Sequence, residues 1–188
     1  MERNRPHCPR LLFRFPWEVS PRAVLDYYRE NRQFLVPWDP PRLPLFYTEE
    51  RQQSYLGEEA DAMAAGQALY WYLTLPEKPE QVIGSVQLTR LTGEPELGYK
   101  LSQSQAGKGL GTEAVRAVLE LARTLEIPRV TALVRPENHP SRRLLEKRYG
   151  GGREPEGSAR GQPAVSDGLP GRGALCGGAL GLEGDPLL

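Results

Sequence analysis

The segment 105–114 constrains this chain more than any other, and it reads Gln-Ala-Gly-Lys-Gly-Leu-Gly-Thr-Glu-Ala. Its three glycines let the backbone approach a ligand closely and adopt dihedral angles that side chains forbid. A helical pattern follows at once, and the first turn of a helix carries unpaired N–H groups and about half a positive charge. Together the glycines and the helix start predict a cradle for a phosphate or pyrophosphate group.

The spacing of these glycines separates the loop from two common phosphate-binding loops. No Gly-Lys-Ser/Thr follows a four-residue gap, so the segment is not a Walker loop. A dinucleotide fingerprint would need a surrounding βαβ unit and an acidic residue at the end of a second parallel strand, and the sequence has neither. On spacing alone, a glycine-rich turn that merely starts a helix remains the alternative.

Hydrophobic periodicity up to residue 149 predicts a mixed α/β (α+β) domain. We expect a strand over 10–15, helices beginning after Ser20 and Thr48, strands over 69–75, 82–91 and 96–101, a helix over 109–125, a strand over 130–134 and a helix over 140–148. Prolines 37, 40, 41 and 44 argue against regular structure between residues 36 and 45. Tight connections make the three middle strands an antiparallel meander, and a right-handed crossover places 130–134 parallel to 96–101.

The last part of the chain, residues 150–188, has a different character. It holds twelve of the 20 glycines, has no aromatic residue, and has no periodic pattern that we recognise. Such a composition buries too little apolar surface to offset the entropy of ordering. We therefore expect a domain over 1–149 and a low-complexity segment over 150–188 that is disordered or aberrant. A reading-frame shift and a natural extension are both open as its origin, and either leaves the strand 130–134 without an outer neighbour.

Composition excludes several classes of protein. The 188 residues suffice for one domain, and the formal net charge of 0 gives no basic excess to favour nucleic-acid binding. No apolar run reaches the roughly 18 residues of a membrane helix and the N-terminus is too polar for a signal peptide, so we expect a soluble cytoplasmic protein with no membrane partner. The two cysteines, Cys8 and Cys176, have no metal-ligand spacing, and we expect no metal and no disulfide framework.

Segments on both sides of the glycine loop resemble those of one enzyme family. Residues 96–101 read Glu-Leu-Gly-Tyr-Lys-Leu, and residues 138–147 read Asn-His-Pro-Ser-Arg-Arg-Leu-Leu-Glu-Lys. With the loop, this trio resembles the GNAT N-acetyltransferases. Residues 26–40, Asp-Tyr-Tyr-Arg-Glu-Asn-Arg-Gln-Phe-Leu-Val-Pro-Trp-Asp-Pro, are similar to the early segment of the Rim-type ribosomal-protein-alanine N-acetyltransferases. The resemblance runs from about residue 10 to residue 147 and implies acetyl-CoA as co-substrate.

The resemblance also implies which residues hold the CoA moiety. The expected contacts are Gly107, Lys108, Gly109, Leu110, Gly111 and Thr112 at the pyrophosphate, Tyr99 and Leu101 along the pantetheine arm, and Asn138 and Ser141 near the thiol. In the family a bulge or splay after Tyr99 frees a backbone N–H for the oxyanion of the tetrahedral intermediate. The chain departs from the family pattern at two places, with Ala106 where Gln or Arg is frequent and Leu145 where many members have the tyrosine that protonates the thiolate.

Candidate catalytic and acceptor residues follow from the same resemblance. Glu96 is the candidate general base and Ser141 a candidate hydrogen-bond donor to sulfur. Alternatively, Glu96 is an ordinary carboxylate on a strand, and Ser141 is a polar residue at a helix start with no catalytic role. Tyr28, Asn31 and Trp38 are expected to line the acceptor groove, although Trp38 could equally belong to the core.

The expected reaction is transfer of the acetyl group from acetyl-CoA to a primary amine. The resemblance over 26–40 favours the N-terminal amino group of a ribosomal or other protein. A small-molecule amine and a weakly active or inactive acyl-CoA-binding paralogue are the two alternatives. The expected acceptor is a protein or peptide N-terminus or a small amine. Measuring acetyl-CoA turnover with a panel of amines would separate these alternatives. The protein itself is expected to be a monomer or homodimer.

Overall fold

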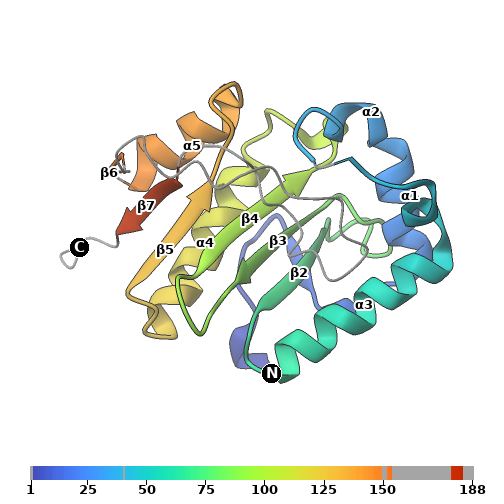
Figure 1. Cartoon of the computed structure of the whole chain (residues 1–188), viewed down its shortest axis with the longest axis horizontal. Helices are drawn as coiled ribbons and strands as arrows, with labels where there is room; N and C mark the ends of the chain where they lie inside the picture. The colour runs from blue at the N-terminus through green and yellow to red at the C-terminus, as the bar shows by residue number, and fades with distance from the viewer. Residues whose placement is uncertain (1, 40, 150–151, 154–178, 184–188) are drawn as a thin grey trace.

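A seven-stranded mixed sheet forms the centre of the computed structural model, which describes residues 2–39, 41–149, 152–153 and 179–183 (Figure 1). The strands stand in the order β1-β2-β3-β4-β5-β7-β6. They are β1 Leu12–Arg14, β2 Leu69–Thr74, β3 Gly84–Thr89, β4 Glu96–Leu101, β5 Arg129–Leu133, β6 Gly152–Arg153 and β7 Ala179–Glu183. The α-helices are α1 Pro21–Glu30, α2 Arg32–Leu35, α3 Glu49–Ala64, α4 Leu110–Thr124 and α5 His139–Tyr149.

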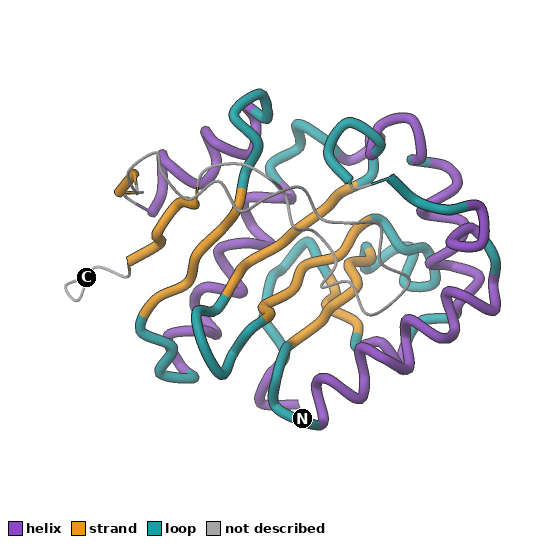
Figure 2. The backbone as a smooth tube through the Cα atoms, in the orientation of Figure 1, coloured by secondary structure: helices purple, strands orange, loops and turns teal. Residues whose placement is uncertain are grey.

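The predicted strand pairing is confirmed. Strands β1 to β4 pair antiparallel in sequence order, and β5 lies parallel to β4 after the α4 crossover. The sheet and the helices that cover it can be followed in the tube of Figure 2. Short 3-10 turns, which periodicity did not predict, join several elements: Glu2–Asn4, Pro16–Glu18, Pro44–Tyr47 and Gln103–Gln105.

Alternation along β2 divides the core between the two faces of the sheet. Trp71 and Leu73 belong to a cluster with Val115 and Val118 of α4, which crosses behind β4 and β5 in Figure 1. Tyr72, between them, belongs to a second cluster with residues of α1 and α3, among them Val24, Tyr28, Tyr55 and Leu56. The sheet is therefore the middle of three layers, as expected when both faces of the strands are apolar.

Helix capping explains why α1 and α3 begin where the sequence predicted. The Ser20 hydroxyl accepts a hydrogen bond from the Ala23 N–H at 3.1 Å, and the Thr48 hydroxyl accepts one from the Arg51 N–H at 3.3 Å. Gly66, just beyond the end of α3, has a φ of +68°. This left-handed conformation is the usual way to end a helix, and glycine adopts it without steric cost.

The C-terminal part of the chain corrects one expectation. Strand β7 pairs antiparallel with β5 at five positions, from Arg129 opposite Glu183 to Leu133 opposite Ala179, and β6 pairs with β7. The expectation that 130–134 has no outer neighbour is therefore wrong. Leu180 and Leu182 alternate with small residues, a pattern too short to stand out within a glycine-rich segment. The remaining residues of 150–188 lie outside the described part of the structure, so the division at residue 149 remains a prediction.

The helices of the described ranges are those of a domain built around a sheet. None of them combines the length and apolar character needed to cross a membrane.

Candidate active site

The glycine loop between β4 and α4 has the conformation that its sequence predicted. Gly107 and Gly109 have φ angles of +77° and +81°, in the left-handed region that favours glycine. Gly109 is also the N-cap of α4, and no side chain caps the helix there. No side-chain oxygen therefore competes with an anion for the N–H groups in the first turn of α4.

Gly111 brings α4 close to β4. A Cβ atom at this position would lie 3.3 Å from Leu101 Cδ1 and 3.4 Å from Tyr99 Cε2. The first distance is tighter than ordinary van der Waals contact and the second is at its lower limit, so glycine allows the helix start to sit directly against the end of the strand. The third glycine of the loop thus serves packing, whereas the first two set the backbone path.

Strand β4 is paired on one edge and open on the other. With β3 it pairs at six positions, whereas its described pairing with β5 consists of Glu96 opposite Thr131 alone. Beyond the strand, the Ser102 N–H donates to the Ile83 carbonyl at 2.7 Å. Because alternate residues of a strand direct their N–H groups to the same side, those of Gly98 and Lys100 face β3.

The same alternation directs the N–H groups of Tyr99 and Leu101 toward β5, where the two strands have already separated. The splay that the resemblance implied is therefore present in the structure. Two backbone donors on this edge are available to a carbonyl or an oxyanion placed between the strands.

The glycine loop is fastened to the N-terminal part of the chain by Arg10. Its Nε lies 3.0 Å from both carboxylate oxygens of Glu113 in the first turn of α4, and its Nη2 donates to the Lys108 carbonyl at 3.1 Å. The hydrogen bonds from Arg10 hold the pKa of Glu113 below its ordinary value. The Cys8 thiol adds a contact of 3.4 Å to Glu113. Arg10 therefore ties the loop and the first turn of α4 to the N-terminal part of the chain through Glu113 and the Lys108 carbonyl.

A pair of hydroxyl groups lies where α5 begins. The Ser141 N–H donates to Asn138 Oδ1 at 3.2 Å, which caps the helix start, and the Tyr99 hydroxyl donates to Ser141 Oγ at 3.0 Å. Burial raises the pKa of Tyr99 above its ordinary value. Leu145, where many family members have tyrosine, is 1% exposed and belongs to the core.

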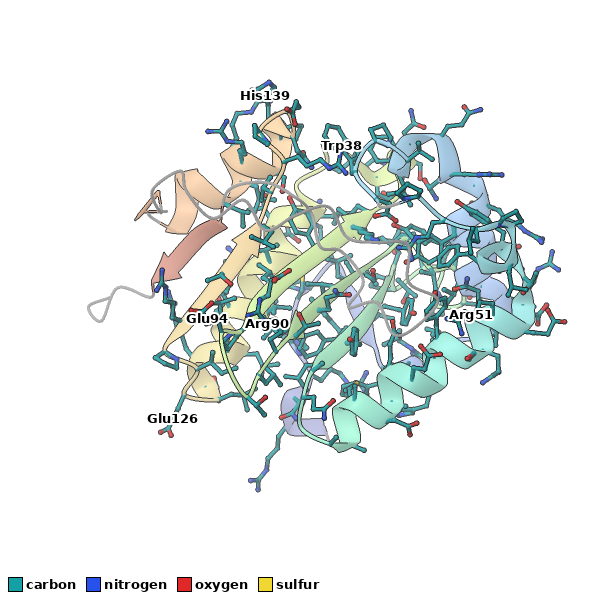
Figure 3. All side chains as sticks on the ribbon, viewed as in Figure 1. Trp38, Arg51, Arg90, Glu94, Glu126 and His139 are labelled. Atoms are coloured by element: carbon teal, nitrogen blue, oxygen red, sulfur yellow. The ribbon has the colours of Figure 1, made fainter. Side chains whose placement is uncertain are left out.

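Glu96 lies at the other end of β4, where the strand is paired with both neighbours. Its carboxylate is 3.5 Å from the Arg90 guanidinium. Burial raises the pKa of Glu96 above its ordinary value, although the Arg90 charge and hydrogen bond oppose the shift. Figure 3 shows Arg90 and Glu94 at this end of the sheet, and Trp38 and His139 at the opposite end. A base role for Glu96 remains a prediction.

The predicted acceptor residues divide into two buried ones and one that is partly exposed. Asn31 is 6% exposed; its amide donates to the Tyr27 carbonyl and accepts from the Gln103 N–H, both at 2.8 Å. Tyr28 packs its ring edge-on against Phe46 within the second core cluster. Tyr28 and Asn31 are therefore buried, whereas Trp38 is partly exposed, and the acceptor roles of all three remain predictions.

A buried ionic cluster ties the segment after α2 to β4. Lys100 Nζ lies 2.6 Å from Asp39 Oδ1, and Arg42 Nη2 lies 3.2 Å from Asp39 Oδ2. Burial alone would raise the pKa of Asp39, but Lys100 and Arg42 outweigh it and hold the pKa below its ordinary value. The side chains are only 7% to 15% exposed. Because alternate residues of a strand point to opposite faces, Lys100 and this cluster lie on the face of β4 opposite Tyr99.

A family model described as an acetyltransferase (GNAT) domain matches residues 10–148. This chain belongs to the GNAT acetyltransferase family. It is 33% identical over 156 residues to the [ribosomal protein uS5]-alanine N-acetyltransferase of Escherichia coli (strain K12), covering 80% of this chain and 78% of that protein. It is also 33% identical to the probable N-acetyltransferase YjcK of Bacillus subtilis (strain 168), over 77% of this chain and 81% of that protein.

Solved structures share the fold. The ribosomal-protein-S5-alanine acetyltransferase from Vibrio fischeri superposes with a TM-score of 0.69 at 22% identity, covering 79% of this chain and 82% of that one. Mycobacterium smegmatis RimJ, in complex with CoA-disulfide, superposes with a TM-score of 0.64 at 23% identity, covering 80% and 79%.

As a GNAT enzyme, the protein is an acetyl-CoA-dependent N-acetyltransferase. Its residues fit the co-substrate, because two left-handed glycines open the start of α4 to a pyrophosphate and two N–H groups of β4 face a gap between strands. Within the ranges that the structure describes, no three His, Cys, Asp or Glu side chains gather where they could hold a metal ion.

Three contacts of the GNAT site were not predicted from the sequence. Arg10 reaches Glu113 across 103 positions, Tyr99 reaches Ser141 across 42, and Lys100 pairs with Asp39. Each partner lies on a different element, so no local spacing could have revealed the pairing. Arg10 itself lies next to a chain reversal at the bridge between Cys8 and Leu11.

Proposed function

We propose that this GNAT enzyme acetylates the N-terminal amino group of a protein, with a ribosomal protein as the acceptor. The observation that carries the proposal is the 33% identity to the E. coli uS5-alanine N-acetyltransferase over 78% of that protein. The family model matches residues 10–148, a range that includes the segment 26–40, which we assign to the acceptor side of the site. A protein acceptor also suits the apolar residues of the neighbouring segment, because Val36, Leu43 and Leu45 are all more than half exposed.

The open edge of β4 positions and polarises the thioester in this proposal. The N–H groups of Tyr99 and Leu101 would bind the pantetheine arm and the oxyanion that forms as the amine attacks. A donor of this kind contributes about 3 kcal/mol to transition-state stabilisation. Holding the thioester and the amine together in a ternary complex supplies the other large contribution.

Proton transfer completes the reaction. An α-amino group has a pKa of about 8, so a base needs to remove one proton only, and Glu96 would do so through water. The raised pKa of Glu96 suits this task, because a base with a pKa closer to neutrality is a better proton acceptor. Ser141 would donate a hydrogen bond to the departing sulfur.

A thiol-release assay tests the acceptor. The full chain is mixed with acetyl-CoA and with synthetic peptides that carry the N-terminal sequences of ribosomal proteins, including ones that begin with alanine. The matched controls are the same peptides with an acetylated N-terminus, and spermidine serves as the small amine. We expect CoA release with one or more free peptides and none with the blocked forms. Release with spermidine alone would instead make the enzyme a small-amine acetyltransferase.

A further inference from the structure

At the start of α5, the predicted donor Ser141 is joined by a second hydroxyl group, that of Tyr99, which the sequence did not predict in this role. When the amine has attacked, the C–S bond of the thioester breaks and the sulfur takes up a proton. The core residue Leu145 cannot supply it, because its side chain has no polar atom. The hydroxyl groups of Ser141 and Tyr99 lie 3.0 Å apart at this end of the site, between β4 and α5.

The direction of this hydrogen bond leaves the serine free to donate. Tyr99 is the donor and Ser141 Oγ the acceptor. A hydroxyl group has one proton and can accept two hydrogen bonds, so Ser141 keeps its own proton for another acceptor. In the described part of the chain no bond is seen from that proton, and the serine is 8% exposed, which leaves it a narrow opening into the site.

Both hydroxyl groups are held in place by the backbone around them. The Ser141 N–H is bonded to Asn138 Oδ1, which fixes the first turn of α5. The Tyr99 ring lies against Gly111, where even a Cβ atom would come within 3.4 Å of it. Burial keeps the phenol protonated throughout the neutral range by raising its pKa, so Tyr99 remains a donor at working pH.

We propose that Tyr99 and Ser141 form a proton relay to the CoA sulfur. As the new C–N bond forms and the C–S bond breaks, Ser141 passes its hydroxyl proton to the sulfur and takes the phenolic proton of Tyr99. Tyr99 regains a proton from water, which has received one from the acetylated amine, so the reaction is balanced. Tyr99 acts through Ser141 as a positioning and proton-supplying residue. The inference rests on the proposed placement of Ser141 beside the sulfur, and it holds for any amine acceptor.

Tyr99→Phe removes the hydroxyl and keeps the ring against Gly111. We expect kcat to fall at least about tenfold, within the low end of general acid catalysis. The Kd for acetyl-CoA, measured by calorimetry, and the melting temperature should stay close to those of the wild type. The alkaline limb of the kcat profile should shift, because the group that titrates there is lost. Tyr70→Phe, a partly buried tyrosine of β2 outside the site, is the matched control and should leave kcat unchanged.

A double-mutant cycle separates a relay from two independent effects. If the protons move in one chain, Tyr99→Phe combined with Ser141→Ala should be no slower than the slower single variant. Single-variant losses that multiply would overturn the relay. A wild-type kcat and pH profile in Tyr99→Phe would also overturn it, as would loss of acetyl-CoA affinity alone. The assay uses an alanine-initiated peptide, or spermidine if that peptide is not turned over, so failure of the ribosomal acceptor is seen separately.

Discussion

The two edges of β4 carry out different tasks with the same backbone. On the β3 edge the strand is paired from Glu96 opposite Thr89 to Leu101 opposite Gly84. On the β5 edge it is paired only at Glu96, opposite Thr131. A strand fixed along one edge can therefore offer its other edge to a ligand without losing its position. In this GNAT enzyme the open edge arises from the divergence of two strands, and we propose that it binds the thioester.

The two faces of β4 show a similar division. Tyr99 lies on the face that packs against α4 and α5, where its hydroxyl contacts Ser141. Lys100 lies on the other face, where it pairs with Asp39 of the segment after α2. We propose that the first face holds the donor side of the reaction and that the second supports the acceptor side. The predictions below test these assignments in order of decreasing effect.

The largest effect is expected at the buried ionic cluster on the acceptor face. Asp39→Asn leaves Lys100 and Arg42 buried without their counter-charge, so we expect a loss of about 3 kcal/mol in the free energy of unfolding by denaturant titration. Asp26→Asn, which removes an exposed partner of Arg22, should cost under about 0.5 kcal/mol. Equal losses in the two variants would show that the cluster is not a buried support.

The pH dependence of the free energy of unfolding tests the ionic cluster around Asp39 independently. Because the folded pKa of Asp39 is lower than its unfolded value, its stabilisation is complete above about pH 4 and is lost as the pH falls through the folded pKa. The difference in stability between the wild type and Asp39→Asn should therefore narrow below about pH 4.

Removal of the candidate base Glu96, at the end of β4 that is paired with both neighbouring strands, should mainly lower kcat. Glu96→Gln is expected to lower kcat by roughly 10²-fold, in the range of general base catalysis, and to flatten the acid limb of the pH profile. In the wild type that limb should lie above the ordinary carboxyl range, because burial raises the pKa of Glu96. Glu94→Gln, an exposed neighbour, is the control. A native rate and profile in Glu96→Gln would assign the proton to another group or to bulk water.

A substitution on the paired edge should destabilise the fold. At Gly84 a Cβ atom would lie 2.3 Å from the Lys100 carbonyl oxygen, so β3 would have to move away from β4. We expect Gly84→Ala to lose about 1–3 kcal/mol in a denaturant titration, the range for overpacking. Gly57→Ala in α3 meets no atom within 4 Å and should be neutral or slightly stabilising. Unchanged stability of Gly84→Ala would mean that this edge is less tightly held than described.

A charge in the glycine loop should act on the open side of the site. Gly109→Glu places a carboxylate where the pyrophosphate is expected, so the affinity for CoA should fall at least about tenfold, or 1.4 kcal/mol. Gly93→Glu, in the turn before β4, introduces the same charge at the far end of the strand and should leave the affinity intact. A folded Gly109→Glu protein with native affinity in calorimetry would remove the loop from the CoA site.

Local chemistry made the elements and the loop predictable from the sequence. The caps Ser20 and Thr48, the stop at Gly66 and the conformations of Gly107 and Gly109 all depend on neighbours within a few residues. Other contacts of the candidate site join segments that are distant in the sequence, such as Tyr99 with Ser141 or Lys100 with Asp39. Hydrophobic periodicity does not predict such contacts. Strand β7 was missed for a related reason, because its pairing with β5 outweighs a composition that does not favour strands.

Amide hydrogen exchange along β4, followed by NMR in the free protein and with acetyl-CoA, tests the asymmetry of its two edges most directly. We expect the N–H groups of Gly98 and Lys100 to be protected in both states, because they are bonded to β3. Those of Tyr99 and Leu101 should exchange rapidly in the free protein and become protected when acetyl-CoA binds. Protection of Tyr99 and Leu101 in the free protein that acetyl-CoA leaves unchanged would contradict the account.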